Sequence, residues 1–507
     1  MPPTGSTNST QSLTPPWLTR RPEVLDLPPL APRRPPSQTS SSSSIPTSPP
    51  DPQTPNNNPT SILTPATLES ALPTPTATTT HKPSHRAYLQ VLVTHLVMFN
   101  SFGLIQSFGI FQPSYETAFS LPPSTIAWIG SIHIFFVYGL GIATGWILSR
   151  NYYRTSLLLG SVLQIIGLAV AGFSRAFAMS FVFHGVFQGV GHGLMFCPAI
   201  TMTAVEWRGK KWRMLALGIG GCGASTGGMV FAGIARYTIG GLGVGPTLWI
   251  MCGVVCVNSV VIQGLARGGY GGGREKSVVT TTMTNSSSDD EARDGSGLEV
   301  ATTTRSSQRH HILNVFRRRA YTLYVLATFA TFTALWIPFF YTREYTSLAL
   351  HVTKPQSFVL LIILNAAGDS GRIVPALLAD RYIGTLNTYI LTLALSSATL
   401  LAWPAVSSVT GMYPWATAYG FCAGGVSSLL QAGIASLNDD AQKTGIEIGV
   451  AFSVVAFASL LGAPVGGELI QVGEKVKGEG TGAYLYMMVL TGVARVVKTG
   501  WRLWVMV

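Results

Sequence analysis

Runs of about 20 apolar residues recur along most of this chain, and each is long enough to cross about 30 Å of hydrocarbon as a helix. The first six predicted spans are Tyr88–Phe111, Thr125–Leu148, Thr155–Phe173, Ala178–Val205, Met214–Ile239 and Thr247–Leu265. The next six are Tyr321–Tyr341, Gln356–Ala379, Tyr389–Ser408, Tyr413–Ile434, Gly445–Ile470 and Tyr484–Val507. The sequence therefore predicts an all-α membrane protein with twelve transmembrane helices in two six-helix bundles. The last span is the weakest, and an interfacial helix is the alternative there.

Two polar regions divide the chain into predicted domains. Residues 1–87 are rich in Pro, Ser and Thr, and they hold too little apolar surface to offset the entropy of ordering them. We expect this tail to be disordered. A second polar stretch, residues 266–320, is predicted to be a linker between an N-terminal bundle over 88–265 and a C-terminal bundle over 321–507.

Charge is sparse, and its distribution indicates a topology. Charged residues make up 11% of the chain, against about 25% in an average soluble domain. With both termini placed inside, the inner connections hold 22 cations and the outer connections six. Cationic loops favour the cytoplasmic side, so we expect both termini and the linker in the cytoplasm and the protein in the plasma membrane. The cations form no single patch, so we expect no nucleic-acid partner.

Charged turns follow the second and eighth predicted spans. The first contains Ser149, Arg150 and Arg154, and the second contains Asp380 and Arg381. These turns, within two sets of six spans, resemble the major facilitator superfamily, whose turn has the pattern G-x-x-x-D-R-x-G-R. The resemblance implies two bundles that rock about a central site, with the four charged residues holding one access state closed. The alternative is that these charges only anchor the turns in the cytoplasm.

A narrower resemblance covers nearly the whole chain after the tail. It rests on the segments Asn100–Gln112, Trp128–Ser131, Pro198–Ala199, Arg208–Gly218, Pro338–Tyr341, Leu364–Asn365, Gly371–Arg372 and Leu378–Arg381. In this order they are similar to the monocarboxylate porter family, particularly its fungal branch. The resemblance implies carriage of a small carboxylate, often with a proton, and points to the arginine of the eighth span, which is Arg372 here.

Arg372 is the centre of the predicted substrate site. A guanidinium inside a membrane span is costly, so Arg372 should face a cavity and hold an anion or an internal acid. Asn365 and Asp369 precede it by seven and three residues, so all three share one helical face. Asp369 is the candidate proton carrier, because an apolar cavity raises a carboxylate's affinity for protons. The alternative is an Asp369–Arg372 ion pair that only supports packing.

Two polar residues of the first span complete the candidate substrate-binding set. Gln106 stands where animal porters of the same family carry a lysine, and Asn100 opens the first segment that carries the resemblance.

The fourth predicted span carries His184, Gln188 and His192 at intervals of four. A metal site is excluded, because eight helical residues rise about 12 Å, farther than the ligands of one ion can span. Interhelical hydrogen bonding and lining of the pathway are the two alternatives. His133 of the second span is expected toward the outer surface.

Several glycines recur within the fifth predicted span, at positions 218, 220, 221, 223, 227 and 228. They lie inside an apolar helix and lack the Lys-Ser/Thr ending of a phosphate loop, so they predict close helix packing.

The sequence thus predicts a secondary transporter that moves a small organic acid or related metabolite by alternating access. Its partners are an anionic small molecule, the lipid bilayer and, if transport is coupled, protons. Export of a secondary metabolite and a non-transporting nutrient sensor are the alternatives. No HExxH, GxSxG or paired intramembrane aspartates mark a catalytic site, and the cysteines lack metal-ligand spacing, so neither an enzyme activity nor a metal or cofactor is expected.

Overall fold

The computed structural model of the chain describes residues 83–266, apart from 142, 144–146, 149 and 151, together with residues 316–435 and 441–493. The predicted tail and linker lie outside these ranges except at their ends. The last predicted span is described only over 484–493, where residues 485–493 are helical. The described part of the chain is helical throughout and contains no strand.

Helices account for every predicted span in the described ranges. The first half contains α1 (His85–Phe119), α2 (Pro123–Gly139), α4 (Tyr153–Ala171), α5 (Phe177–Ser180), η4 (Phe181–Phe187), α6 (Gln188–Glu206), α7 (Arg213–Leu242) and α8 (Val244–Ala266). The second half contains α10 (Arg319–Leu335), α11 (Ile337–Glu344), η5 (Tyr345–Ala349), α12 (Lys354–Leu378), η6 (Ala379–Ile383), α13 (Thr385–Ala402), η7 (Trp403–Ala405), α14 (Val409–Ala435) and α15 (Ala441–Lys477).

Two helices differ from their predicted spans, each for a local reason. The first continues through Pro113 to Phe119 and ends at Ser120, whose left-handed φ of 52° stops it. The seventh breaks between α10 and α11 at Trp336. Pro338 then sits in the first turn of α11, where its missing N–H costs no intrahelical hydrogen bond.

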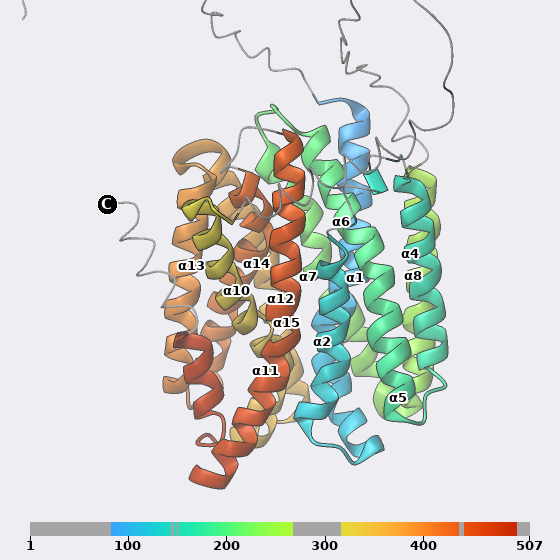
Figure 1. Cartoon of the computed structure of the whole chain (residues 1–507). Coiled ribbons are helices and arrows are strands. Elements are labelled where there is room, and N and C mark those ends of the chain that lie inside the picture. The colour runs from blue at the N-terminus through green and yellow to red at the C-terminus, as the bar shows by residue number, and fades with distance from the viewer. Residues whose placement is uncertain are drawn as a thin grey trace, which may run out of the picture. The chain divides into compact units, whose positions relative to one another are not determined.

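The helices of the two halves lie side by side. All described residues belong to one unit, Ala77–Val507, and Figure 1 shows the blue-to-green helices α1–α8 beside the yellow-to-red helices α10–α15. The halves meet mainly where α2 packs along α15 and α7 packs along α12. The long helix α1 also contacts α11. Residues on α1, α7 and α12 can therefore share one site.

Glycines allow the closest of these helix contacts. A Cβ on Gly103 of α1 would lie 2.7 Å from the backbone of Gly227 on α7, and one on Gly218 of α7 would lie 2.7 Å from the carbonyl oxygen of Arg372. Gly223 of α7 abuts the carbonyl oxygen of His95 in the same way. The prediction that the glycine-rich stretch serves helix packing is confirmed.

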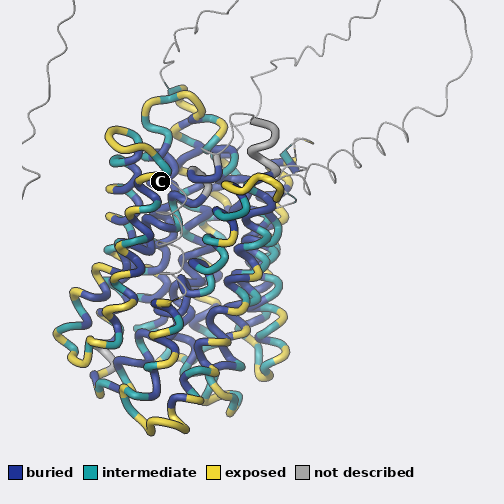
Figure 2. Tube along the Cα trace, turned by 60° about the vertical axis from the view of Figure 1, so that its left-hand side comes forward, coloured by how far each residue is buried: buried dark blue, intermediate teal, exposed yellow. Residues whose placement is uncertain are grey.

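The outward faces of the helices are apolar. Exposed apolar side chains include Leu158, Leu159 and Val162 of α4 and Val257 and Val260 of α8. Figure 2 shows that the buried residues lie in the interior, between the helices. Eight helices in the described part of the chain are long and apolar enough to cross a membrane. Because backbone polar groups in lipid must be satisfied internally, helices suit this setting. The predicted all-α membrane fold is confirmed.

Candidate functional site

The side chain of Arg372 reaches from α12 toward the first bundle. It is only 4% exposed. Its Nη1 donates hydrogen bonds to the hydroxyl of Ser225 on α7 and, at 3.1 Å, to the carbonyl oxygen of Gly368 one turn earlier. Gly221 leaves space for the aliphatic stem, since a Cβ there would lie 3.3 Å from Arg372 Cδ. A cation is thus held at the contact between the bundles.

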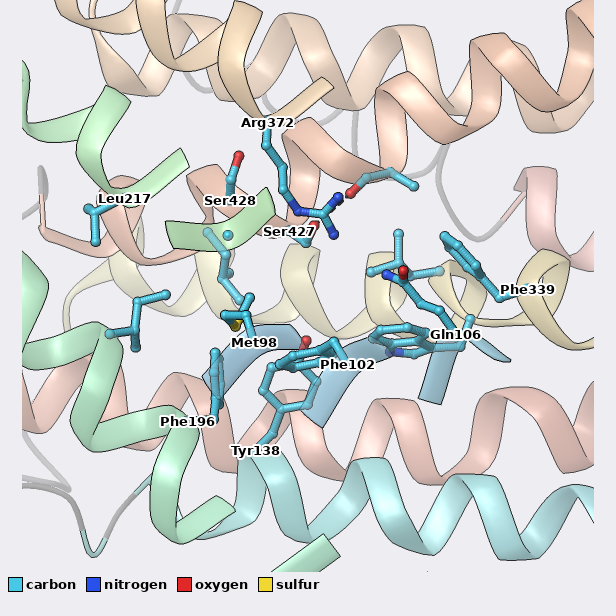
Figure 3. Close-up of a pocket in the computed structure, with 16 residues that line it drawn as sticks. Met98, Phe102, Gln106, Tyr138, Phe196, Leu217, Phe339, Arg372, Ser427 and Ser428 are labelled. Carbon is cyan, nitrogen blue, oxygen red and sulfur yellow. Dashed lines mark hydrogen bonds between the residues drawn. The ribbon is translucent and has the colours of Figure 1, made fainter. Parts of the chain in front are cut away.

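A small cavity of about 30 Å³ surrounds this guanidinium. Both bundles line it, and Figure 3 shows Arg372 and Gln106 reaching into the same space from opposite walls. Its apolar floor includes Phe102 and Trp336, whose rings stack 5.8 Å apart. Ser427 of α14 adds a hydroxyl. The volume holds about two water molecules, so this conformation closes around the site.

Asn365 and Asp369 project toward the same helix, α7, as Arg372 does. The Asn365 Oδ1 lies against Gly228 of α7, and a Cβ added to that glycine would also lie 2.8 Å from Gln106 Oε1. The backbone carbonyl oxygen of Asp369 accepts a hydrogen bond from the thiol of Cys222, also on α7, at 3.7 Å. The side-chain oxygens Asn365 Oδ1, Gln106 Oε1 and Asp369 Oδ1 are buried without a hydrogen-bond partner. These orphaned acceptors are costly unless a ligand, water or proton satisfies them.

The ion pair that the sequence left open does not form in this conformation. The described residues contain no ion pair between Asp369 and Arg372; the ion pair found among them joins Arg318 to Glu447 at 3.2 Å. The hydrogen bonds of Arg372 therefore go to the Ser225 hydroxyl and the Gly368 carbonyl, while Asp369 acts on its charge from beyond ion-pair distance.

Asn100 is not brought to this cavity. Its Oδ1 accepts a hydrogen bond from Asn258 Nδ2 of α8 at 3.0 Å. Six residues separate Asn100 from Gln106, a rotation of about 240° on an α-helix, so the two amides face different neighbours. Asn100 supports packing inside the first bundle.

Among the four predicted turn residues, Asp380 contacts the opposite bundle. Its Oδ1 and Oδ2 accept from the backbone N–H groups of Met214 at 3.1 Å and Leu215 at 2.9 Å. These amides open α7 and have no intrahelical partner, and a carboxylate also suits the positive end of a helix dipole. Asp380 of the second bundle thus caps a helix of the first. Gly384, with a φ of 77°, ends the turn.

The three arginines of the turns are exposed. Arg150 and Arg154 flank the start of α4, and Arg381 lies on η6, where its guanidinium sits 5.5 Å from the ring of Tyr382. Ser149 lies outside the described residues.

The histidines of the fourth span bond to neighbouring helices. His184 Nδ1 pairs with the hydroxyl of Tyr115 on α1 at 2.9 Å, and Gln188 donates to the carbonyl oxygen of Gln164 on α4 at 2.5 Å. His192 pairs with His133 of α2. The His133 side chain is 2% exposed and faces α6, and its place toward the outer surface of the membrane stays a prediction. Interhelical hydrogen bonding therefore accounts for His184, Gln188 and His192.

A larger vestibule of about 720 Å³ opens at the ends of α1, α7 and α11 remote from Asp380. It is lined by Glu116, Arg236, Arg343 and Glu344, which come from both bundles. Glu344 is buried, and its carboxylate accepts from Gln112 Nε2 at 3.3 Å and from the Tyr484 hydroxyl at 3.1 Å. Glu344 is not among the predicted site residues, because the predicted span ends at Tyr341 whereas α11 continues past it.

Two halves that meet around a buried cation, with one end closed by a charged turn, match a known transporter architecture. A family model described as Major Facilitator Superfamily matches residues 92–467, which run from α1 into α15. The chain belongs to the Major Facilitator Superfamily. A solved structure of a Major Facilitator Superfamily transporter, FucP, in the outward conformation shares this fold with a TM-score of 0.56. At 14% identity, the match covers 82% of this chain and 99% of that one.

Similar proteins of this superfamily come from fungi. An MFS-type transporter of Gibberella zeae is 30% identical over 79% of this chain and 83% of that protein. The aspyridones efflux protein of Emericella nidulans is 27% identical over 76% of this chain and 72% of its own length. The agnestins efflux protein of Paecilomyces divaricatus is 26% identical over 82% of this chain and 86% of that protein. The chain is therefore a multi-pass membrane transporter for a small molecule.

Proposed function

We propose that this transporter exports a small organic metabolite that carries a carboxylate or another negatively charged group. The buried guanidinium of Arg372 carries the proposal, because it lines a cavity shared by both bundles and makes no ion pair among the described residues. A buried cation that no carboxylate contacts directly is costly. A cargo that supplies the negative charge would remove that cost.

Neighbouring groups would orient the cargo. The unpartnered oxygens of Asn365 and Gln106 can accept hydrogen bonds from a hydroxyl or amide of the metabolite. Asp369, with one carboxylate oxygen unpartnered, can take up a proton and so couple transport to a pH gradient. The roles of Asn365 and Asp369 follow from the helical face that they share with Arg372.

The names of two relatives favour export over uptake. Both are described as efflux proteins, one for aspyridones and one for agnestins. Import of a nutrient carboxylate through the same site is the second candidate, because the resemblance to monocarboxylate porters favours it. With cytoplasmic termini in the plasma membrane, Asp380 would close the cytoplasmic end and the vestibule at Glu344 would open outward.

Comparison of extracellular metabolites tests the direction. Cells that produce the protein are expected to accumulate an acidic metabolite in the medium that matched cells without it retain inside. Inside-out vesicles should then take up that metabolite, and a pH gradient should change the rate if Asp369 couples a proton. Faster depletion of an acid from the medium by the producing cells would instead support import.

Replacing Asp380, which caps the start of α7, is expected to open the end of the transporter that this contact holds closed. Removing a side-chain cap costs about 1–2 kcal/mol, so Asp380→Ala should raise the population open at that end by roughly 5- to 30-fold. A cysteine placed at Ser428, which lines the cavity, would report the change as faster labelling by a maleimide in inside-out vesicles.

Two variants control this measurement. Asp380→Asn keeps one acceptor oxygen and should give an intermediate rate, whereas Arg319→Gln, an exposed change at the start of α10, should leave the rate unchanged. Equal labelling in Asp380→Ala and the parent would show that the contact does not hold that end closed.

A further inference from the structure

A groove on the outer surface of the first bundle is separate from the transport pathway. It lies between the first turns of α1 and α7 and encloses about 520 Å³. We call it the α1–α7 groove; its lining includes Tyr88, Leu92, Trp207, Trp212 and Ile219. Volumes of about 300–1,000 Å³ are usual for small-molecule sites.

The walls of the α1–α7 groove are apolar and face away from the protein. Tyr88 is 56%, Leu92 44% and Ile219 43% exposed. These side chains stand on two helices that are long and apolar enough to cross a membrane. An apolar groove in that position fits a hydrocarbon chain.

The floor of the groove is rigid. Trp207 is buried against Ala87, Val91 and Ala216 in a small cluster apart from the main core. Its indole N–H donates to the carbonyl oxygen of Ala87 at 3.1 Å, and the ring of Tyr88 meets it edge-on at 5.4 Å. The groove is therefore preformed, which reduces the ordering cost of filling it.

Cations stand at one end of the groove. The ammonium of Lys210 lies 5.7 Å from the ring centre of Trp207, and that of Lys211 lies 5.3 Å from the ring centre of Trp212. Lys210 also donates to the backbone carbonyl of Glu206. Arg208 is exposed in the same turn. No described carboxylate forms an ion pair with either lysine.

We propose that the α1–α7 groove binds an anionic glycerophospholipid, with an acyl chain along Leu92 and Ile219 and the phosphate beside Lys210 and Lys211. Tryptophans favour the level of the headgroups, and Trp207 and Trp212 place the two ammonium groups at that level. Basic clusters beside a membrane helix attract anionic lipids, which are abundant in the cytoplasmic leaflet. This is the leaflet expected at the Asp380 end, where α7 begins.

Native mass spectrometry of the full chain, released from detergent in the presence of added lipid, tests the site. Phosphatidylserine and phosphatidylcholine with the same acyl chains are compared. The parent protein should retain phosphatidylserine preferentially. Because each lysine near a headgroup contributes about 1 kcal/mol, Lys210→Gln together with Lys211→Gln should lower phosphatidylserine retention roughly 30-fold and leave phosphatidylcholine retention unchanged.

A matched pair of lysines provides the control. Lys475 and Lys477 occupy the last turn of α15 and are exposed, and the Lys477 ammonium also faces an aromatic ring, that of Tyr486, at 5.9 Å. Changing both to Gln should not alter retention. An equal loss in the two double variants, or no loss in Lys210→Gln/Lys211→Gln, would overturn the proposal.

A third variant separates a lipid from a free phosphate. Ile219→Trp fills the groove without changing charge, and it should reduce retention of both phospholipids. Two results would contradict a bound acyl chain: phosphatidylserine still bound to Ile219→Trp, or phosphatidylserine displaced from the parent by inorganic phosphate. Either result would show that the lysines bind a headgroup or phosphate alone.

Discussion

Arg372→Ala is expected to abolish transport of the anionic metabolite. The guanidinium is buried between the bundles and makes no ion pair among the described residues, so it is available to the cargo. Removing one member of a buried, hydrogen-bonded charge pair costs about 2–5 kcal/mol, which corresponds to a loss of at least 30-fold in affinity. Counterflow in proteoliposomes loaded with the metabolite measures the change.

Two further variants distinguish a lost anchor from a damaged protein. Arg372→Lys keeps the charge without the planar fork and should retain part of the activity. Arg175→Ala, in the exposed connection between α4 and α5, should behave as the parent. Counterflow unaltered in Arg372→Ala would remove the anchor role, and normal monodispersity on size exclusion would show that an inactive variant is still folded.

Gly223→Ala is expected to destabilise the first bundle. A Cβ at this position would collide with the backbone carbonyl of His95 on α1, and a backbone cannot rotate away as a side chain can. Overpacking costs about 1–3 kcal/mol or more, which exceeds the gain of about 1 kcal/mol in helix propensity on replacing Gly by Ala. The melting temperature in detergent and the folded yield should both fall.

Gly233→Ala on the same helix is the matched comparison. A Cβ there would meet nothing within 4 Å, so this variant should melt at or above the temperature of the parent. Equal melting temperatures for Gly223→Ala and Gly233→Ala would contradict the close approach of α1 and α7.

Helix positions could be predicted from the sequence because lipid imposes a length and a composition on each span. The prediction was less accurate at helix ends. α1 runs on past Pro113, and α11 carries Glu344 beyond the predicted end at Tyr341. Both extensions contain polar residues, so they resemble loops in composition although they continue the helices.

Arg372 could be found from the sequence because a lone cation inside an apolar span is costly unless it faces a cavity or a negatively charged partner. Its partner Ser225 could not, since a serine in a glycine-rich helix carries no signal. The contact of Asp380 was also hidden, because its partners are backbone amides of Met214 and Leu215. The position of Asn100 away from the cavity was hidden too, since the resemblance gave its segment and not its helical face.

The most direct test compares two ligands on the parent protein: the acidic metabolite that accumulates outside producing cells and its methyl ester. If Arg372 anchors the negative group, the acid should bind at least about 30-fold more tightly than the ester, and the difference should vanish in Arg372→Gln. Equal binding of acid and ester to the parent, or an undiminished preference in Arg372→Gln, would show that the cavity recognises the cargo without its charge.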